Sequence, residues 1–178
     1  MAKVAIIESV EHKIMRKSGR KLTQCNCKKC QFQCKSPCLG TPKDILNIIK
    51  AGYKDKVAIT YWAAGMVMGV INRPVPMVQP LFNEETGYCV FFKDGLCELH
   101  DKKLKPIEGK LSHHSLKIDN FNPKKSLAWL VAKEWISDSN LDIVEEITLR
   151  LVVDESISQT NLEELINEFK SNKRESLL

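Results

Sequence analysis

Five of the chain's seven cysteines fall within fourteen positions, in the stretch CNCKKCQFQCKSPC at residues 25–38. Cysteines that only pack in a core have no reason to recur at intervals of two, three, four and four residues. Such short spacings instead let a tight loop turn several sulfurs toward one centre, as in zinc–thiolate sites. The run therefore predicts a metal-binding segment with these candidate ligands: Cys25, Cys27, Cys30, Cys34 and Cys38.

Disulfide bonding is the competing explanation for so many cysteines. The N-terminal residues show no secretory signal, because a lysine stands at position 3 and no sustained apolar region follows. The longest uncharged stretch, at 57–72, is shorter than the roughly 20 residues that cross a bilayer. We therefore expect a cytoplasmic protein that does not enter a membrane, in which thiols stay reduced and an odd number of cysteines cannot pair completely.

A second group of donors lies around a predicted β-hairpin at 87–100, GYCVFFKDGLCELH, with its turn at 93–95. Cys89 and Cys97 are expected on its opposite arms, and Cys97-x2-His100 has ligand spacing. Seven cysteines and His100 make eight donors, the number that two closed four-coordinate sites require. Without a metal, His100 would be a surface residue at a strand end.

We expect these donors to divide into two sites. Cys25 to Cys34 are close enough in sequence to form one centre locally, and the second centre would then use Cys38, Cys89, Cys97 and His100. In an alternative arrangement the hairpin cysteines complete the first cluster and Cys25 stays free. His113 and His114 are adjacent, so at most one is expected to reach a common centre, and each alone is typical of a polar loop.

The remaining patterns predict an α+β fold. A helix is expected after Thr41-Pro42, a second over 55–64, and short strands in the proline-punctuated stretch 67–82, whereas 3–10 has the composition of a strand and 11–21 looks exposed. Helical spacing returns after Asn122-Pro123, continues over 141–153, and ends with a Thr160–Glu163 capping box before a last helix. Trp129, Leu130 and Trp135 are candidate core residues.

Three parts follow from these patterns. Residues 1–24 form a basic N-terminal segment and 25–120 a cysteine-rich metal-binding domain with a helix and a small antiparallel hairpin or sheet. Residues 121–178 form a helical C-terminal extension packed on that domain.

Positive charge gathers at the N-terminal end. Residues 1–35 carry nine Lys or Arg and two Glu, although the whole chain has a net charge of only +5. A basic segment can bind nucleic acid, but a solvated face is the commoner explanation, and lysines beside cysteines also favour thiolates. Nucleic acid is therefore a partner that the sequence allows but does not favour.

Taken together, these motifs resemble the zinc- or iron-chelating domain family named for its CxxCxxCC pattern. Its members pair an N-terminal cysteine cluster with a C-x-F-L... C-x-I-Y hairpin and an R-P-x-x-C-R element. The matching stretches lie between about residues 25 and 115: Cys27-Lys-Lys-Cys30 through Cys34, Cys38-Leu-Gly-Thr-Pro-Lys-Asp, Cys89-Val-Phe-Phe, Cys97-Glu-Leu-His100 and Lys105-Pro-Ile-Glu-Gly-Lys. The chain departs from the family in that its paired CC is opened out and Gly109 stands where the last cysteine would be. The resemblance implies a metal site without a defined reaction, with His100, His113 or His114 substituting for the missing thiolate.

The sequence indicates the class of metal and the general role of the protein. Mixed Cys/His ligands and the lack of a C-x2-C-x2-C-x3-C-P run favour zinc, whereas dense thiolates also suit iron or an iron–sulfur cluster. No Ser-His-Asp order, phosphate-binding glycine loop or HExxH helix is visible, so no reaction is assigned. We expect a metal-stabilised binding module with a protein partner. The alternatives are an iron–sulfur protein for redox chemistry or protein modification, and a nucleic-acid-binding zinc module.

Overall fold

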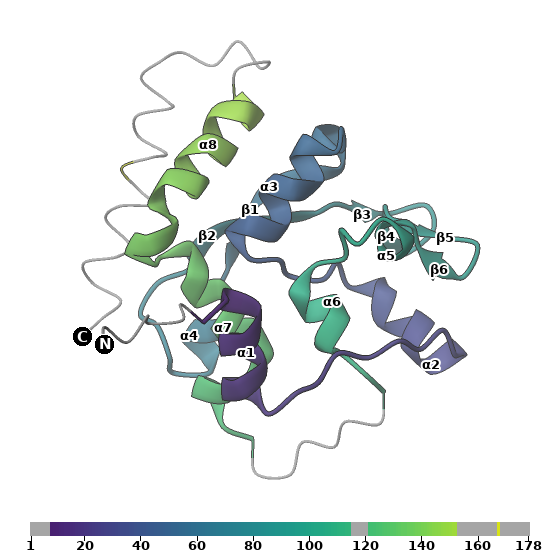
Figure 1. Cartoon of the computed structure of the whole chain (residues 1–178), viewed down its shortest axis with the longest axis horizontal. Helices are drawn as coiled ribbons and strands as arrows, with labels where there is room; N and C mark the ends of the chain where they lie inside the picture. The colour runs from purple at the N-terminus through teal and green to yellow at the C-terminus, as the bar shows by residue number, and fades with distance from the viewer. Residues whose placement is uncertain (1–7, 115–120, 153–166, 168–178) are drawn as a thin grey trace, which may run out of the picture.

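A computed structural model of the chain describes residues 8–114 and 121–152, together with Asn167. These residues form an α+β architecture of eight α-helices and three two-stranded antiparallel sheets, with a helical C-terminal part (Figure 1). The helices are α1 (Val10–Ser18), α2 (Lys28–Phe32), α3 (Pro42–Lys50), α4 (Ala64–Val67), α5 (Glu98–Asp101), α6 (Ile107–Leu111), α7 (Leu127–Trp135) and α8 (Leu141–Val152). The sheets pair β1 (Val57–Trp62) with β2 (Val75–Pro80), β3 (Phe82–Asn83) with β4 (Tyr88–Cys89), and β5 (Phe92–Lys93) with β6 (Leu96–Cys97).

Helix α3 forms as its sequence predicts. Thr41 is the N-cap, and its hydroxyl accepts a hydrogen bond from the Asp44 N–H while the Asp44 side chain accepts from the Thr41 N–H, which completes a capping box. Pro42 occupies the first turn, where its missing N–H costs nothing. Ile45 and Ile48 on the inner face are fully buried. The helix thus anchors the chain just after Cys38.

The helix expected over 55–64 is wrong, because Val57–Trp62 is strand β1. It pairs antiparallel with β2 in the register Val57↔Pro80 to Trp62↔Val75. The run is rich in β-branched and aromatic residues, which favour strands. A short apolar run does not distinguish helical from strand periodicity, and pairing with β2 makes this one a strand. The short strands expected within 67–82 are present as β2 and β3.

The N-terminal segment is more ordered than expected. Residues 1–7 lie outside the described part, but Val10 begins α1 rather than ending a strand. Ile14 on this helix is 1% exposed and belongs to the main core, so 11–21 is not an exposed lead-in. Lys13 donates to the buried carboxylate of Glu134 on α7 at 2.8 Å, so part of the N-terminal positive charge is used inside the fold.

The expected hairpin around 93–95 is present, but it is shorter and its neighbours differ. Asp94 and Gly95 both have positive φ angles, as a tight two-residue turn between β5 and β6 requires. Cys97 pairs with Phe92, whereas Cys89 pairs with Phe82 in the preceding sheet. The two cysteines therefore lie on two successive hairpins and not on opposite arms of one.

The helical C-terminal part packs into the same core as the earlier elements. Trp135 and Leu130 of α7 are buried together with Ile14 and the inner face of α3, and α8 lies along α3 (Figure 1). Asn122 caps a short 3-10 turn (Pro123–Lys125), and Ser126 then caps α7. The last predicted helix, after Thr160, lies outside the described residues. The boundaries at 24 and 120 stay a prediction.

Within the described ranges, no helix has both the length and the apolar character that spanning a membrane requires.

Trp135 supplies a test of how the C-terminal part is attached. Its buried indole N–H donates to the Gly40 carbonyl at 2.8 Å, next to the α3 cap. Trp135→Phe is expected to lower the free energy of unfolding by about 1–3 kcal/mol, because a buried carbonyl loses its donor. Chemical denaturation measures the change. Trp129→Phe is the control, since Trp129 is only partly buried and stacks on Trp62; equal losses in both variants would contradict a specific role for the bond.

Candidate metal centre

A backbone strap brings the start of the cysteine run beside the two adjacent histidines. The Thr23 N–H donates to the Lys110 carbonyl at 3.0 Å, and the Thr23 hydroxyl lies 3.2 Å from both the Lys110 and the Ser112 carbonyl. Arg20 donates to the Leu111 carbonyl at 3.4 Å. Since Thr23 is two residues before Cys25 and Ser112 directly precedes His113, the strap places ligands from distant parts of the chain at one point.

Four side chains converge there. One ligand atom each of Cys25, Cys30, His113 and His114 lies within 4.8 Å of all the others. His114 Nδ1 is 3.2 Å from the Cys30 sulfur, although these residues are 84 positions apart, and the two histidine ring centroids are 4.3 Å apart. Two thiols and two imidazoles at this spacing form a group that can hold a metal ion. We call it the Cys2His2 cluster.

Cys27 stands at the edge of this cluster. Its sulfur is 3.4 Å from His114 Nδ1, and it is the N-cap residue of α2. The backbone N–H of Cys30 is the main cause that lowers the pKa of the Cys27 thiol, with help from Cys25 and the Lys29 N–H. Burial raises the pKa of Cys30, and a hydrogen bond with the His114 backbone opposes this. Cys27 is therefore a fifth donor next to the cluster.

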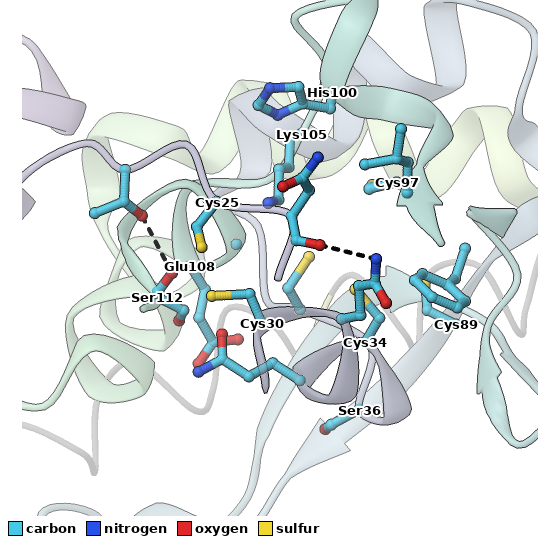
Figure 2. A pocket seen from close by; sticks show the side chains of 18 of the residues that line it. Cys25, Cys30, Cys34, Ser36, Cys89, Cys97, His100, Lys105, Glu108 and Ser112 are labelled. Atoms are coloured by element: carbon cyan, nitrogen blue, oxygen red, sulfur yellow. Dashed lines mark hydrogen bonds between the residues drawn. The ribbon is translucent and has the colours of Figure 1, made fainter. Parts of the chain in front are cut away.

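The remaining cysteines gather on the other side of a pocket of about 690 Å³. Figure 2 shows Cys25 and Cys30 at one end of this pocket, and Cys34, Cys89 and Cys97 at the other. Four thiols line this second end, and we call them the four-thiol group: Cys34, Cys38, Cys89 and Cys97.

The four-thiol group is less exposed to water than the cluster. Burial is the largest cause that raises the pKa of each of its thiols, to about 11 for Cys89 and well above the ordinary value for Cys38. The thiols also raise one another's pKa values, and Glu108 raises that of Cys38, whereas Lys105 acts in the opposite direction on Cys34, Cys38 and Cys97. Without a cation these groups are neutral thiols at pH 7.

Backbone groups and an ion-pair network hold Cys97 in place. Its sulfur accepts from the Leu99 and His100 N–H groups at the start of α5. Glu98 accepts from the Tyr53 hydroxyl at 2.9 Å and pairs with Lys56 at 3.4 Å and Lys102 at 3.1 Å. These bonds lower the pKa of Glu98 to about 2, chiefly through Tyr53 and Lys102. The residue after Cys97 is thus fixed to the turn that follows α3.

The donors predicted from the sequence are all near this pocket, but they are grouped differently. Cys34 leaves the N-terminal run and joins Cys38, Cys89 and Cys97 at the far end of the pocket. Cys25, the thiol expected to stay free in the alternative arrangement, is inside the Cys2His2 cluster. His100 is an exposed residue that lines the pocket and is not part of the cluster, so its role as a ligand stays a prediction.

Sequence reasoning missed that both adjacent histidines reach one centre. Their rings are tilted by 34° rather than turned to opposite sides, because Ser112 and the strap fix the loop that follows α6. One feature of the sequence does point to a histidine ligand: Gly109 stands where the CxxCxxCC family has its last cysteine, so a histidine would have to replace that thiolate. The sequence does not indicate which histidine does so.

Comparisons of the chain with protein-family models, with curated proteins and with solved structures find no match. The resemblance to the CxxCxxCC family therefore stays a prediction, and the geometry alone carries the functional argument.

The strap can be tested through its threonine. Thr23→Val removes both hydroxyl bonds but keeps the side-chain volume and the backbone bond to Lys110. It is expected to weaken metal binding at the Cys2His2 cluster several-fold, which corresponds to the loss of about 1 kcal/mol. Competition with a chromophoric chelator measures the affinity. Ser36→Ala, which alters an exposed residue of the same pocket, is the control; an unchanged affinity in Thr23→Val would show that the strap does not position ligands.

Proposed function

We propose that the chain is a cytoplasmic binding module whose fold is stabilised by a zinc ion in the Cys2His2 cluster. The convergence of two thiols and two imidazoles within 4.8 Å carries this proposal. A tetrahedral zinc site needs four such ligands, with bonds of about 2.3 Å to sulfur and about 2.0 Å to nitrogen. Zinc is favoured because mixed sulfur and imidazole ligation suits this borderline-soft ion.

The position of the cluster supports a structural role. Cys25 and Cys30 precede and follow the start of α2, whereas both histidines come from the loop after α6. An ion held by all four would close a long loop of chain and add to the few hydrogen bonds of the strap. Structural zinc in small sites contributes on the order of 10 kcal/mol of folding free energy, so binding would fix this whole end of the molecule.

The number of donors argues for binding rather than catalysis. A catalytic zinc has three protein ligands and a free position for water or substrate. Here four ligand atoms converge and the Cys27 sulfur lies close enough to replace one of them. A saturated ion has no position for a substrate, so we assign a recognition role, with a protein partner, and no reaction.

The experiment compares variants of the full chain. His114→Gln and Cys30→Ser are expected to lose one zinc per chain and to unfold at lower denaturant concentration, because each removes a ligand of the cluster. His100→Gln is the matched control, since it alters an exposed histidine of the same pocket outside the cluster. Elemental analysis of protein purified without added metal measures the zinc content.

Two outcomes would contradict the proposal. One is a wild-type chain that contains no zinc and is not stabilised by it. The other is the loss of zinc from His100→Gln together with its retention in His114→Gln, which would move the site to the hairpin.

A further inference from the structure

The four-thiol group differs in geometry from the Cys2His2 cluster. Among the residues that the structure describes, only the Cys2His2 cluster brings three or more donors within 4.8 Å of one another. No three of the four sulfurs meet this spacing, although all four line one pocket and act electrostatically on one another. The sulfurs around a single tetrahedral zinc would lie about 3.8 Å apart, as bonds of about 2.3 Å dictate.

We propose that this group binds an iron–sulfur cluster, at a second site separate from the zinc. Such clusters are held by four cysteine thiolates that bind different irons, so their sulfurs stand farther apart than around one ion. The ligands would be Cys34, Cys38, Cys89 and Cys97. This inference adds a second centre to the proposed zinc module, and does not depend on the zinc site being occupied.

The pocket that these four sulfurs line supplies the space. It extends from them to Cys25 and Cys30, and its whole volume of about 690 Å³ leaves room for a group larger than a single ion. The side chains of Phe92 and Leu96 also line this pocket. Soft sulfur donors suit a group with its own sulfides better than a hydrated hard ion.

Gly109 keeps part of this space open. A Cβ atom there would lie 3.1 Å from the Cys38 sulfur and 2.9 Å from Lys105 Cε. Gly109 is inside helix α6 and does not have the positive φ angle that would require glycine. A glycine in a helix costs about 0.5–1 kcal/mol relative to alanine, so it needs another reason. Room beside the Cys38 sulfur is such a reason.

Charge and hydrogen bonds also fit an anionic cluster. Four thiolates give the assembled centre a net negative charge, and the Lys105 ammonium is near three of the four thiols. Backbone N–H groups point at two of the sulfurs, that of Phe91 at Cys89 and those of Leu99 and His100 at Cys97. Hydrogen bonds to the cysteine sulfurs are among the features that tune such clusters. On binding, the four thiols release their protons to solvent and iron takes their place.

The first measurement needs no variant. The wild-type chain, purified without oxygen, is expected to be brown and to contain iron and acid-labile sulfide in equal amounts, in addition to its zinc. A colourless protein with two zinc ions per chain and no sulfide would overturn the proposal, because the four thiols would then have closed around a second zinc.

Variants then separate the two sites. Cys89→Ser and Cys97→Ser are expected to lose iron and sulfide and to keep zinc, whereas His114→Gln is expected to lose zinc and keep iron. Retention of iron in both serine variants would overturn the assignment of these ligands. If the wild type contains no iron but His114→Gln loses zinc, the proposal of an iron–sulfur cluster is rejected and the proposal of a zinc module is supported.

Gly109→Ala tests the space beside Cys38 without removing a ligand. It is expected to lower the iron and sulfide content severalfold while the zinc content stays unchanged, with Ser36→Ala as the control in the same pocket. An alanine variant that is more stable and equally rich in iron would contradict this use of the glycine.

Discussion

Helix α6 is the element on which both groups of cysteines depend. It is only five residues long, but the Glu108 carboxylate accepts the Leu39 N–H at 2.6 Å, and the Glu108 N–H donates back to the Leu39 carbonyl at 3.3 Å. At the other end of the helix the Lys110 carbonyl receives Thr23. These bonds attach both flanks of the cysteine run to one short helix. The run itself contains only two short helical segments, Lys28–Phe32 and Gln33–Lys35, so this attachment decides which way its sulfurs point.

The attachment also explains why the run divides. Its first part follows the strap and meets the histidines after α6, whereas Cys38 is held beside Leu39 and the α3 cap, next to the hairpins. Cys34 lies between these anchors, at the end of the short helical turns, and faces the pocket that Cys89 and Cys97 enter from the other side. Spacing along the chain groups Cys34 with its nearest neighbours, but the fold places it with cysteines more than 50 positions away. The hydrogen bonds to α6, and not the spacing of the cysteines along the chain, therefore determine which cysteines belong to the Cys2His2 cluster and which to the four-thiol group.

Local signals were sufficient for some parts of the fold and not for others. The Thr41-Pro42 cap, the turn at 93–95 and the apolar repeat of α8 each lie within a few residues, and each predicted element is present. The expectation of a helix over β1 is wrong because the strand depends on pairing with β2, whose partner residues run from Val75 to Pro80. The sequence does not predict helix α1 for a similar reason. Ile14 packs in the core with residues of α7, and Lys13 forms an ion pair with Glu134 of α7, more than 100 positions away. Likewise, the cysteine run predicts that metal donors gather around residues 25–38. That His113 and His114 both join the Cys2His2 cluster depends on the long-range hydrogen bonds of the strap, which the spacing of residues along the chain does not reveal.

X-ray absorption at the zinc edge of the full chain tests directly whether sulfur and nitrogen bind the zinc ion together. We expect a first coordination shell with sulfur at about 2.3 Å and nitrogen at about 2.0 Å. His114→Gln, which is expected to lose the ion, should give no signal from bound zinc, and the shell should be unchanged in His100→Gln. A shell of sulfur alone would contradict the account, because it would place the ion among the cysteines and leave the paired histidines without a role.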